Sequence, residues 1–193
     1  MPTFGLIVEG VSDEKALPEI IQKIAGGDIE FIVRPIAATG KFVTMFPAFL
    51  QEFEKLNIRI DKALVIRDAD NRDPREIEQG LKQRLQEKIQ GRKSPFPFPV
   101  NIHVIVQELE TWLLADEQAI SVITGERASR TVTRIQETLE SIQNPRERLT
   151  GVLGADIPYT PEVARRIAEE VNVETIKYRC PRFKMFCDQI LNA

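Results

Sequence analysis

Three carboxylates follow apolar runs of the kind that forms buried strands. Glu9 ends the run FGLIVE, and Asp68 and Asp70 follow the run KALVIR. Carboxylates at one edge of a sheet could hold Mg²⁺, a hard ion that takes few protein carboxylates and completes its shell with waters and substrate phosphates. Without a cation, the clustered acids would repel one another and raise one another's pKa. These residue types therefore predict a Mg²⁺ site, with Mn²⁺ as a substitute.

The spacing of the acids suits a shared site. Asp68 and Asp70 are two residues apart, so an extended backbone would place both side chains on one side. Gly10 follows Glu9 and permits the tight turn or close backbone approach that a strand-to-helix loop needs. The alternative is that acids at strand ends only cap the next helix, but Glu is not a preferred N-cap residue. We therefore favour a functional role for these acids.

Capping explains other polar residues in the same loops. Ser12, Asp13 and Asp73 are of the types that cap helices, and Asp73 stands directly before Pro74. These residues are therefore expected at helix starts.

Strands and helices alternate in the first hundred residues. The expected strands cover residues 4–9, 29–36, 62–67 and 100–106, and the expected helices cover about 13–25, 41–56 and 74–90. Apolar strands separated by helices favour a mostly parallel sheet covered on both faces. Ligands bind beyond the carboxyl ends of such strands, and right-handed crossovers would leave the first and third strands close together. We predict an α/β fold with a mostly parallel four-stranded sheet flanked by helices.

Helical patterns replace the strand patterns after residue 106. The expected helical segments are ELETWLLADEQAISVIT, RTVTRIQETLESIQ, PRERLTGVL, TPEVARRIAEEV and CPRFKMFCDQIL. Before the fourth strand, the prolines of GRKSPFPFPV exclude a helix and predict an extended connector. We predict an α/β core over residues 1–106 and a helical C-terminal region over residues 107–193, packed on the core or projecting from it.

Composition limits the classes of partner and compartment. A formal charge of −3 gives no global attraction to nucleic acid, so such a partner would need a local basic patch. No stretch approaches the roughly 18 apolar residues of a membrane span. Cys180 and Cys187 lie about 10 Å apart along an expected helix, too far for a disulfide. Reduced thiols predict a cytoplasmic protein, and the lack of a long apolar stretch predicts no membrane partner.

Two motifs resemble a known family. LIVEGVSDEKAL resembles the Toprim signature of a hydrophobic strand followed by Glu-Gly and Ser-Asp, especially its variant in the overcoming-lysogenization-defect nucleases, and VIRDADNRD resembles the Toprim Asp-x-Asp. Toprim domains occur in primases, topoisomerases, recombination-mediator proteins and ribosomal-RNA maturation nucleases. The resemblance covers about residues 4–106. It implies that Glu9, Asp68 and Asp70 hold Mg²⁺ and that Glu9 serves as acid or base.

A second resemblance involves the C-terminal region. ELETWLLAD and CPRFKMF resemble segments of uncharacterised prokaryotic Toprim-like proteins that carry a helical C-terminal region. It supports the fold more than the function. Glu110 and Glu108 follow the fourth strand and, with Asp13, are weaker candidates for a second metal or a base. Both glutamates could equally form the acidic first turn of a helix, and Trp112 is expected in the core.

Four residues are candidates for phosphate binding: Gly10, Lys15, Lys41 and Lys184. The segment RPIAATGKF lacks the first Gly and the final Ser or Thr of a phosphate-binding loop, which excludes nucleotide binding by that motif. Lys41 follows the second strand and could still reach a phosphate, or it could be a solvated lysine. The lone His103 cannot build a zinc site without further ligands.

Two functions remain open. The first is a Mg²⁺-dependent phosphodiester hydrolase, a nuclease that acts on nucleic acid held by a local basic patch. The second is a non-catalytic interaction module of a defence or toxin-type system, whose helical C-terminal region binds a protein partner.

Overall fold

A four-stranded parallel sheet forms the centre of the molecule in the computed structural model, which describes residues 1–37, 40–90, 95–125 and 138–192. The strands are β1 (Thr3–Val8), β2 (Glu30–Pro35), β3 (Lys62–Asp68) and β4 (Val100–Ile105). Their order is β2-β1-β3-β4, and every neighbouring pair is parallel. The predicted α/β fold is confirmed, and β1 and β3 are direct neighbours.

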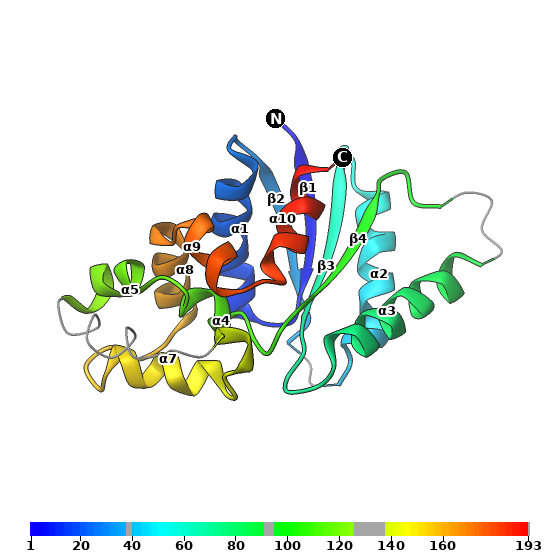
Figure 1. Ribbon diagram of the computed structural model, residues 1–193. Coiled ribbons are helices and arrows are strands. Elements are labelled where there is room, and N and C mark those ends of the chain that lie inside the picture. Colours follow the sequence, from blue (N-terminus) through cyan, green and yellow to red (C-terminus); the bar gives the residue numbers. More distant parts are fainter. Residues whose placement is uncertain (38–39, 91–94, 126–137, 193) are drawn as a thin grey trace.

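Helices cover both faces of the sheet (Figure 1). The three helices that alternate with the strands are α1 (Val11–Ala25), α2 (Phe42–Lys55) and α3 (Pro74–Ile89). Leu6 and Val8 of β1 pack in one apolar cluster with α1, whereas Ile7 packs in a second cluster with α2 and α3. Successive side chains of a strand point to opposite faces, so β1 contributes to two cores at once.

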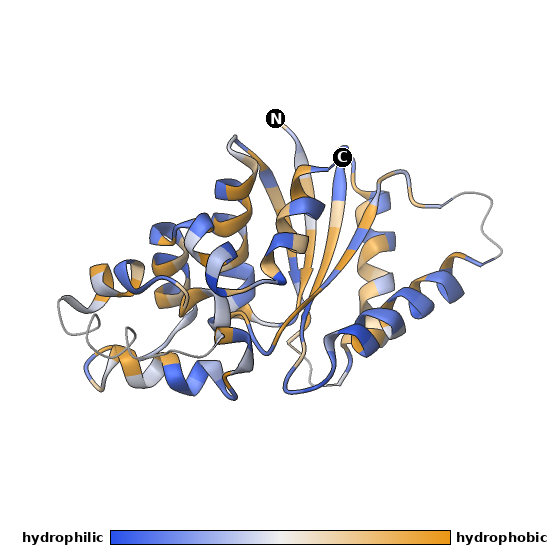
Figure 2. Cartoon of the chain, viewed as in Figure 1, coloured by the Kyte–Doolittle hydropathy of each residue, from blue (hydrophilic) through white to orange (hydrophobic). Residues whose placement is uncertain are grey.

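The central strands β1 and β3 are buried along almost their whole length because helices cover both of their faces. Figure 2 shows this pattern as mostly hydrophobic strands between helices whose outer sides are hydrophilic. Gly5 of β1 permits a close approach of α2, because a Cβ at this position would lie 2.6 Å from a ring carbon of Phe53. The apolar strands therefore favour a sheet covered by helices, and Gly5 allows α2 to pack close to β1.

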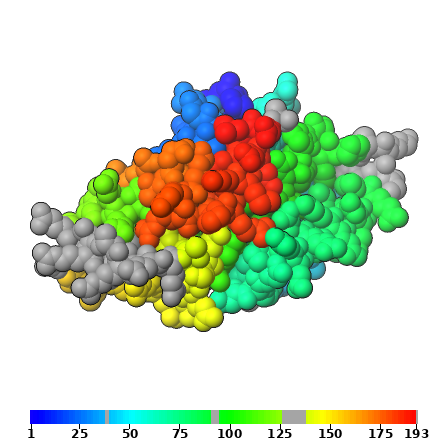
Figure 3. All heavy atoms as spheres, viewed as in Figure 1, coloured from blue at the N-terminus to red at the C-terminus, as the bar shows by residue number. Residues whose placement is uncertain are grey.

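The C-terminal region is helical. Its elements are α4 (Glu110–Leu113), α5 (Glu117–Thr124), the 3₁₀ helix η2 (Leu139–Ser141), α7 (Pro145–Leu153), α8 (Pro161–Glu170), α9 (Val173–Arg179) and α10 (Phe183–Leu191). Helix α8 packs along α1, and the region shares one apolar cluster with β1 and α1. In Figure 3 the orange and red surface of the last helices borders the blue-green surface of α3, where Arg182 lies 3.6 Å from Glu78.

Three helical predictions need correction. The segment ELETWLLADEQAISVIT is interrupted because Asp116 adopts an extended backbone and its carboxylate caps α5, accepting from the N–H groups of Gln118 and Ala119. Helix α9 was not predicted. The helix expected from Cys180 begins only at Phe183, since Cys180 ends α9. Most of RTVTRIQETLESIQ lies outside the described residues, which resume at Thr138.

Aromatic rings join the helical region to the sheet. Trp112 is 1 % exposed, and its ring centroid lies 4.7 Å from that of Phe183 and 5.0 Å from that of Phe186. His103 of β4 lies beside Trp112 and Phe186, and burial lowers its pKa from 6.5 to about 3. Trp112 is therefore a core residue, as predicted, and His103 is a neutral neighbour.

Lys62 fastens the end of α10 to the start of β3. Its buried ammonium donates to the backbone carbonyls of Gln189, Ile190 and Asn192 at 2.8, 3.0 and 2.7 Å. The last carbonyls of a helix have no partner within the helix, so a cation there satisfies them. The helix is thus held at the edge of the sheet opposite to the strand-end acids.

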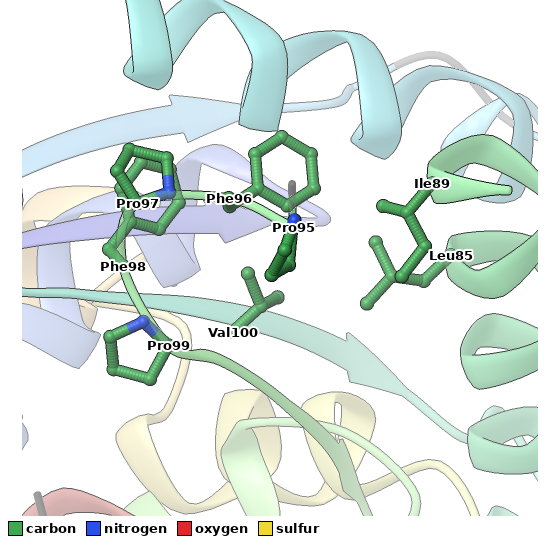
Figure 4. A pocket seen from close by; sticks show the side chains of 8 residues that line it. All are labelled: Leu85, Ile89, Pro95, Phe96, Pro97, Phe98, Pro99 and Val100. Atoms are coloured by element: carbon green, nitrogen blue, oxygen red, sulfur yellow. The ribbon is translucent and has the colours of Figure 1, made fainter. Parts of the chain in front are cut away.

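The proline-rich connector is not helical over its described residues, 95–99, and residues 91–94 lie outside the description. Its rings lie opposite Leu85 and Ile89 of α3 around an apolar cavity of about 460 Å³ (Figure 4). Both cysteines are buried and free. None of the helices in the described part of the chain has the length and apolar character needed to cross a membrane.

Candidate metal centre

The predicted acids lie at the carboxyl edge of the sheet. Glu9 directly follows β1, and Asp68 is the last residue of β3. The two strands are paired through Ile7 and Val65, so their ends are adjacent. The Asp68 N–H donates to the Glu9 Oε2 at 3.3 Å. The neighbouring strands therefore bring Glu9 and Asp68 together.

The chain turns sharply after Asp68 and does not stay extended as the spacing suggested. Asp70 and Asn71 have φ angles of 48° and 64°, in the left-handed region, which residues other than glycine adopt at some cost. Gln107 stabilises the turn: its carbonyl accepts from the Asp70 N–H at 3.1 Å and its Oε1 accepts from the Asn71 N–H at 3.1 Å. The turn positions Asp70 by backbone contacts with the segment after β4.

The acids line a cavity of about 460 Å³. Its lining residues are Glu9, Gly10, Val11, Ser12, Asp13, Asp68, Asp70, Glu108, Glu110, Arg146 and Pro161. They come from the ends of β1 and β3, the segment after β4, and the starts of α1, α4, α7 and α8, near the lower ends of the strands in Figure 1. Six of the lining side chains are carboxylates, so the cavity has a strong excess of negative charge.

Burial and mutual repulsion raise the pKa values of these acids. The pKa of Asp68 lies well above 3.8, first because of burial and then because of the charges of Asp13 and Glu110. Asp13 is 7 % exposed, and burial together with Glu110 raises its pKa from 3.8 to about 7. Burial also raises the pKa of Glu110 and, against the attraction of Arg67, that of Glu9. Each shift marks a carboxylate that a cation would stabilise.

Arginines neutralise the three principal acids only in part. Arg67 Nε lies 3.5 Å from the Glu9 Oε2 without forming a hydrogen bond. Arg72 Nη2 lies 3.2 Å from the Asp70 Oδ2, and both side chains are about half exposed, where an ion pair contributes little. Pairing of all three acids with arginine would argue against a metal. Within the described residues, the Asp68 carboxylate has no hydrogen bond or ion pair.

Gly10 and Asp13 form a hydrogen bond at the start of α1. Gly10 is the N-cap of α1, and its N–H donates to the Asp13 Oδ2 at 2.7 Å. The prediction that Gly10 binds phosphate is therefore not supported, because its amide already has an acceptor. Asp13 combines the expected role at a helix start with a place in the cavity, whereas Asp73 only caps α3 by accepting from the Arg75 N–H at 2.8 Å.

Glu108 and Glu110 have different surroundings. Glu108 Oε2 accepts from the Arg146 N–H at 3.1 Å, which connects it to the start of α7. Glu110 is 4 % exposed in the first turn of α4 and faces the same cavity. The hydroxyl of Tyr159 lies near Glu110 and Ser12 but makes no hydrogen bond of good geometry with either. Both glutamates line the cavity, and Glu110 is the more buried acid.

The candidate lysines do not line the cavity. Lys15 is exposed on α1, Lys41 is exposed directly before α2, and Lys184 is exposed on α10. The basic side chain that does line it within the described part of the chain is Arg146 of α7. Sequence reasoning missed Arg146 and Tyr159, because their place depends on how α7 and α8 pack and no local motif marks them.

The donor set consists of oxygen atoms. In the ranges that the structure describes, no three His, Cys, Asp or Glu side chains form a preformed ligand group. Mg²⁺ does not need one, since it is usually held by one or two carboxylates and keeps several waters. The carboxylates around the cavity therefore fit a hydrated Mg²⁺ better than a zinc ion, which prefers nitrogen and sulfur ligands.

Comparison with known proteins gives one family. Residues 8–191 match the family described as "Domain of unknown function (DUF4276)". The chain belongs to this family. No curated protein and no solved structure gives a significant match. The DUF4276 match begins at the last residue of β1 and includes Glu9 as well as α10, so it covers the acidic residues and the C-terminal helices together.

The acids make a testable contribution to stability. The folded protein binds a proton at Asp13 more tightly than the unfolded chain does, because the pKa rises from 3.8 to about 7. This contribution is present below about pH 4 and is lost as the pH rises through about 7. Asp13→Asn keeps an acceptor oxygen for the Gly10 N–H and removes the charge. The variant should therefore become more stable than the wild type as the pH rises.

Thermal unfolding of the two proteins in a chelator, from about pH 5 to about pH 8, measures this difference. Millimolar Mg²⁺ should restore the wild type more strongly at the higher pH, because protons compete with metal for carboxylates. A difference between the two proteins that does not change with pH would contradict the assignment.

Proposed function

We propose that the chain is a Toprim-type, Mg²⁺-dependent phosphodiester hydrolase that acts on nucleic acid in the cytoplasm. The observation that carries the proposal is the Asp68 carboxylate, whose pKa is raised by burial and by four neighbouring acids. It has no cationic partner among the described residues. Such an arrangement is costly to keep without a cation, and it agrees with the resemblance of the Glu-Gly and Asp-x-Asp motifs to Toprim proteins.

Each principal acid would have a defined role. The ion would be held by Glu9, Asp68 and Asp70. The Asp68 N–H donates to Glu9, and the turn that Gln107 stabilises positions Asp70. Glu110 lies in the same cavity as a further ligand. When bound, Mg²⁺ would polarise a phosphate oxygen and neutralise the charge that develops during hydrolysis.

Hydrolysis needs proton transfer as well as a metal. The oxygen of water forms a bond to phosphorus, the ester P–O bond breaks, and the departing oxygen takes up a proton from solvent. The proton released by the water must pass to a nearby base. The resemblance to Toprim proteins implies that Glu9 acts as the general acid or base. Asp13, whose pKa is about 7, is a second candidate, since an acid that titrates near neutral pH exchanges protons efficiently.

Metal-dependent stabilisation and cleavage test this proposal. We expect millimolar Mg²⁺ or Mn²⁺ to raise the melting temperature and to permit cleavage of a member of a panel of single- and double-stranded DNA and RNA. A chelator should remove both effects. If millimolar Mg²⁺ gives no stabilisation, the proposal fails at its first step. The panel also identifies the substrate.

A non-catalytic interaction module is the second candidate. Tyr178 of α9 is 88 % exposed and Met185 of α10 is 48 % exposed, and exposed apolar side chains are common at protein interfaces. A partner from a defence or toxin-type system would then bind the C-terminal helices. A purified partner that binds wild type and Asp68→Asn equally would favour this function, whereas cleavage of nucleic acid would exclude it as the whole account.

A further inference from the structure

A phosphate group entering the acidic cavity needs a cationic side chain beside the proposed metal. The ionised groups among the six acids of the cavity repel a phosphate, and a hydrated Mg²⁺ offsets only part of their charge. Enzymes that transfer or cleave phosphoryl groups commonly place a lysine or arginine on the phosphate for this reason. The cation must therefore come from a residue that lines the cavity.

Arg146 has the required position. Its backbone N–H donates to the Glu108 Oε2 at 3.1 Å, which fixes the start of α7 against the segment after β4. Its guanidinium carbon lies 5.4 Å from the centre of the Tyr159 ring. The Tyr159 hydroxyl lies near Glu110 and Ser12, two other residues of the lining. The guanidinium is thus held beside the acids by one backbone contact and one ring.

The guanidinium remains available for a ligand. Arg146 is exposed, and within the described ranges it forms no ion pair. Its charge acts on Glu110 from a distance, where it lowers the pKa that burial raises. An arginine that faces several acids without pairing closely with any of them can contact an incoming anion without first breaking a salt bridge.

Other arginines near the acids are already engaged. Arg67 is buried, lies 3.5 Å from Glu9 and packs with its guanidinium carbon 5.5 Å from the centre of the Phe42 ring. Arg72 contacts Asp70 and also donates from its Nε to the Ala69 carbonyl at 3.2 Å. Neither side chain is part of the cavity lining. Arg146 differs from both because it lines the cavity and its guanidinium forms no ion pair within the described residues.

We propose that Arg146 binds the phosphate of the substrate beside the metal held by Glu9 and Asp68. This inference rests on the proposed function. It names the residue that binds the phosphate and the helix that supplies it. The sheet would supply the metal ligands, and α7 of the C-terminal region would supply the cation. Guanidinium groups suit this role because their planar N–H groups can donate two parallel hydrogen bonds to one phosphate.

Binding of deoxythymidine 5′-monophosphate tests the proposal without requiring cleavage. This probe carries one phosphate on a nucleoside and resembles a product of phosphodiester hydrolysis. Calorimetric titration of this probe into the full chain in the presence of Mg²⁺ should show binding of the probe, and a chelator should remove it. Arg146→Ala should weaken binding about 10- to 100-fold, the range for loss of hydrogen bonds to a charged group. Arg146→Lys should give an intermediate value, because lysine keeps the charge but loses the paired geometry.

Arg148→Ala is the matched control, since it removes one positive charge from an exposed position of the same helix α7, outside the cavity lining. It should bind the probe like the wild type. A role of Arg146 that is merely structural would also weaken Mg²⁺ binding and lower the melting temperature. We expect Arg146→Ala not to weaken Mg²⁺ binding, because it removes a positive charge near Glu110. Its melting temperature should change little, because the Glu108 contact uses the backbone of residue 146.

The outcomes separate the two proposals. If Arg146→Ala binds the probe like the wild type, or if the wild type binds Mg²⁺ but no probe, the role of Arg146 is wrong and the proposed metal site stands. If the wild type binds no Mg²⁺, the proposed function fails and the role of Arg146 fails with it.

Discussion

Asp68→Asn is expected to lose Mg²⁺ binding and to reduce metal-dependent cleavage by about 1,000-fold or more. A metal ion contributes several kcal/mol of charge stabilisation to such a reaction, and each 1.36 kcal/mol corresponds to a factor of ten in rate. Asparagine has nearly the same shape as aspartate but provides a neutral oxygen. The variant therefore removes the charge that the ion requires and leaves the turn after β3 in place.

The same substitution should make the metal-free protein more stable. The pKa of Asp68 is raised in the folded protein, so its ionised form opposes folding at neutral pH and a neutral side chain does not. We expect the free energy of unfolding of the metal-free variant at about pH 7.5 to be higher than that of the wild type, because the raised pKa of Asp68 means that its ionised form opposes folding. The two effects have opposite signs, as is common where function requires unfavourable charges.

Asp73→Asn is the control for both effects. Asp73 lies in the loop that follows Asp68 but caps α3 outside the cavity, and asparagine is also a good N-cap. Titration with Mn²⁺, urea unfolding and the cleavage assay should show little change in this variant. Unchanged Mn²⁺ affinity in Asp68→Asn would contradict the proposed role of Asp68.

Trp112→Ala is expected to lower the free energy of unfolding by about 3–5 kcal/mol, the range for removal of a large buried aromatic side chain. The indole contacts Phe183 and Phe186 of α10 as well as His103 of β4. Its loss would leave a cavity between the sheet and the helical region. Trp112 lies two residues after Glu110 in α4, so the same change should also disturb this acid.

Urea unfolding followed by circular dichroism measures the loss in Trp112→Ala. Trp112→Phe keeps a ring in the cluster and should cost less, because the cavity that remains is smaller. A loss below about 1 kcal/mol in Trp112→Ala would contradict the view that this ring anchors the helical region, since the value would lie in the range of ordinary single substitutions.

Periodicity and capping residues predicted the α/β part of the fold well. The apolar run from Lys62 formed β3, and Pro74 and Asp73 marked the start of α3 as expected. Local signals suffice here because the central strands β1 and β3 are apolar on both faces and the loops contain residues with clear turn or cap preferences. The neighbouring positions of β1 and β3 followed from the handedness of crossovers.

Boundaries in the C-terminal region were harder to predict. Asp116 ends one helical pattern because its carboxylate caps α5 and also accepts from the Asn172 N–H at 2.8 Å, a contact between distant segments. Nothing in the local sequence indicates that partner. Helix α9 has only seven residues, Val173–Arg179, which is too short for periodicity to distinguish it from a loop.

The site was predictable in its acids and not in its cations. Glu9 and Asp68 could be placed because strand ends of a parallel sheet meet at one edge. Lys15 follows the Glu9 motif and Lys41 follows the second strand, but both side chains are exposed and lie outside the cavity lining, as does Lys184. Arg146 is far from both motifs in sequence and reaches the cavity only through the packing of α7 against the segment that contains Glu108.

The central claim is that Glu9, Asp68 and Asp70 bind one divalent cation, and a crystal soaked in Mn²⁺ tests it most directly. We predict an anomalous density peak between the Glu9 carboxylate and the two aspartates, which disappears in Asp68→Asn. The claim would be contradicted by a well-ordered site without such a peak, in which Glu9 and Asp70 remain paired with Arg67 and Arg72.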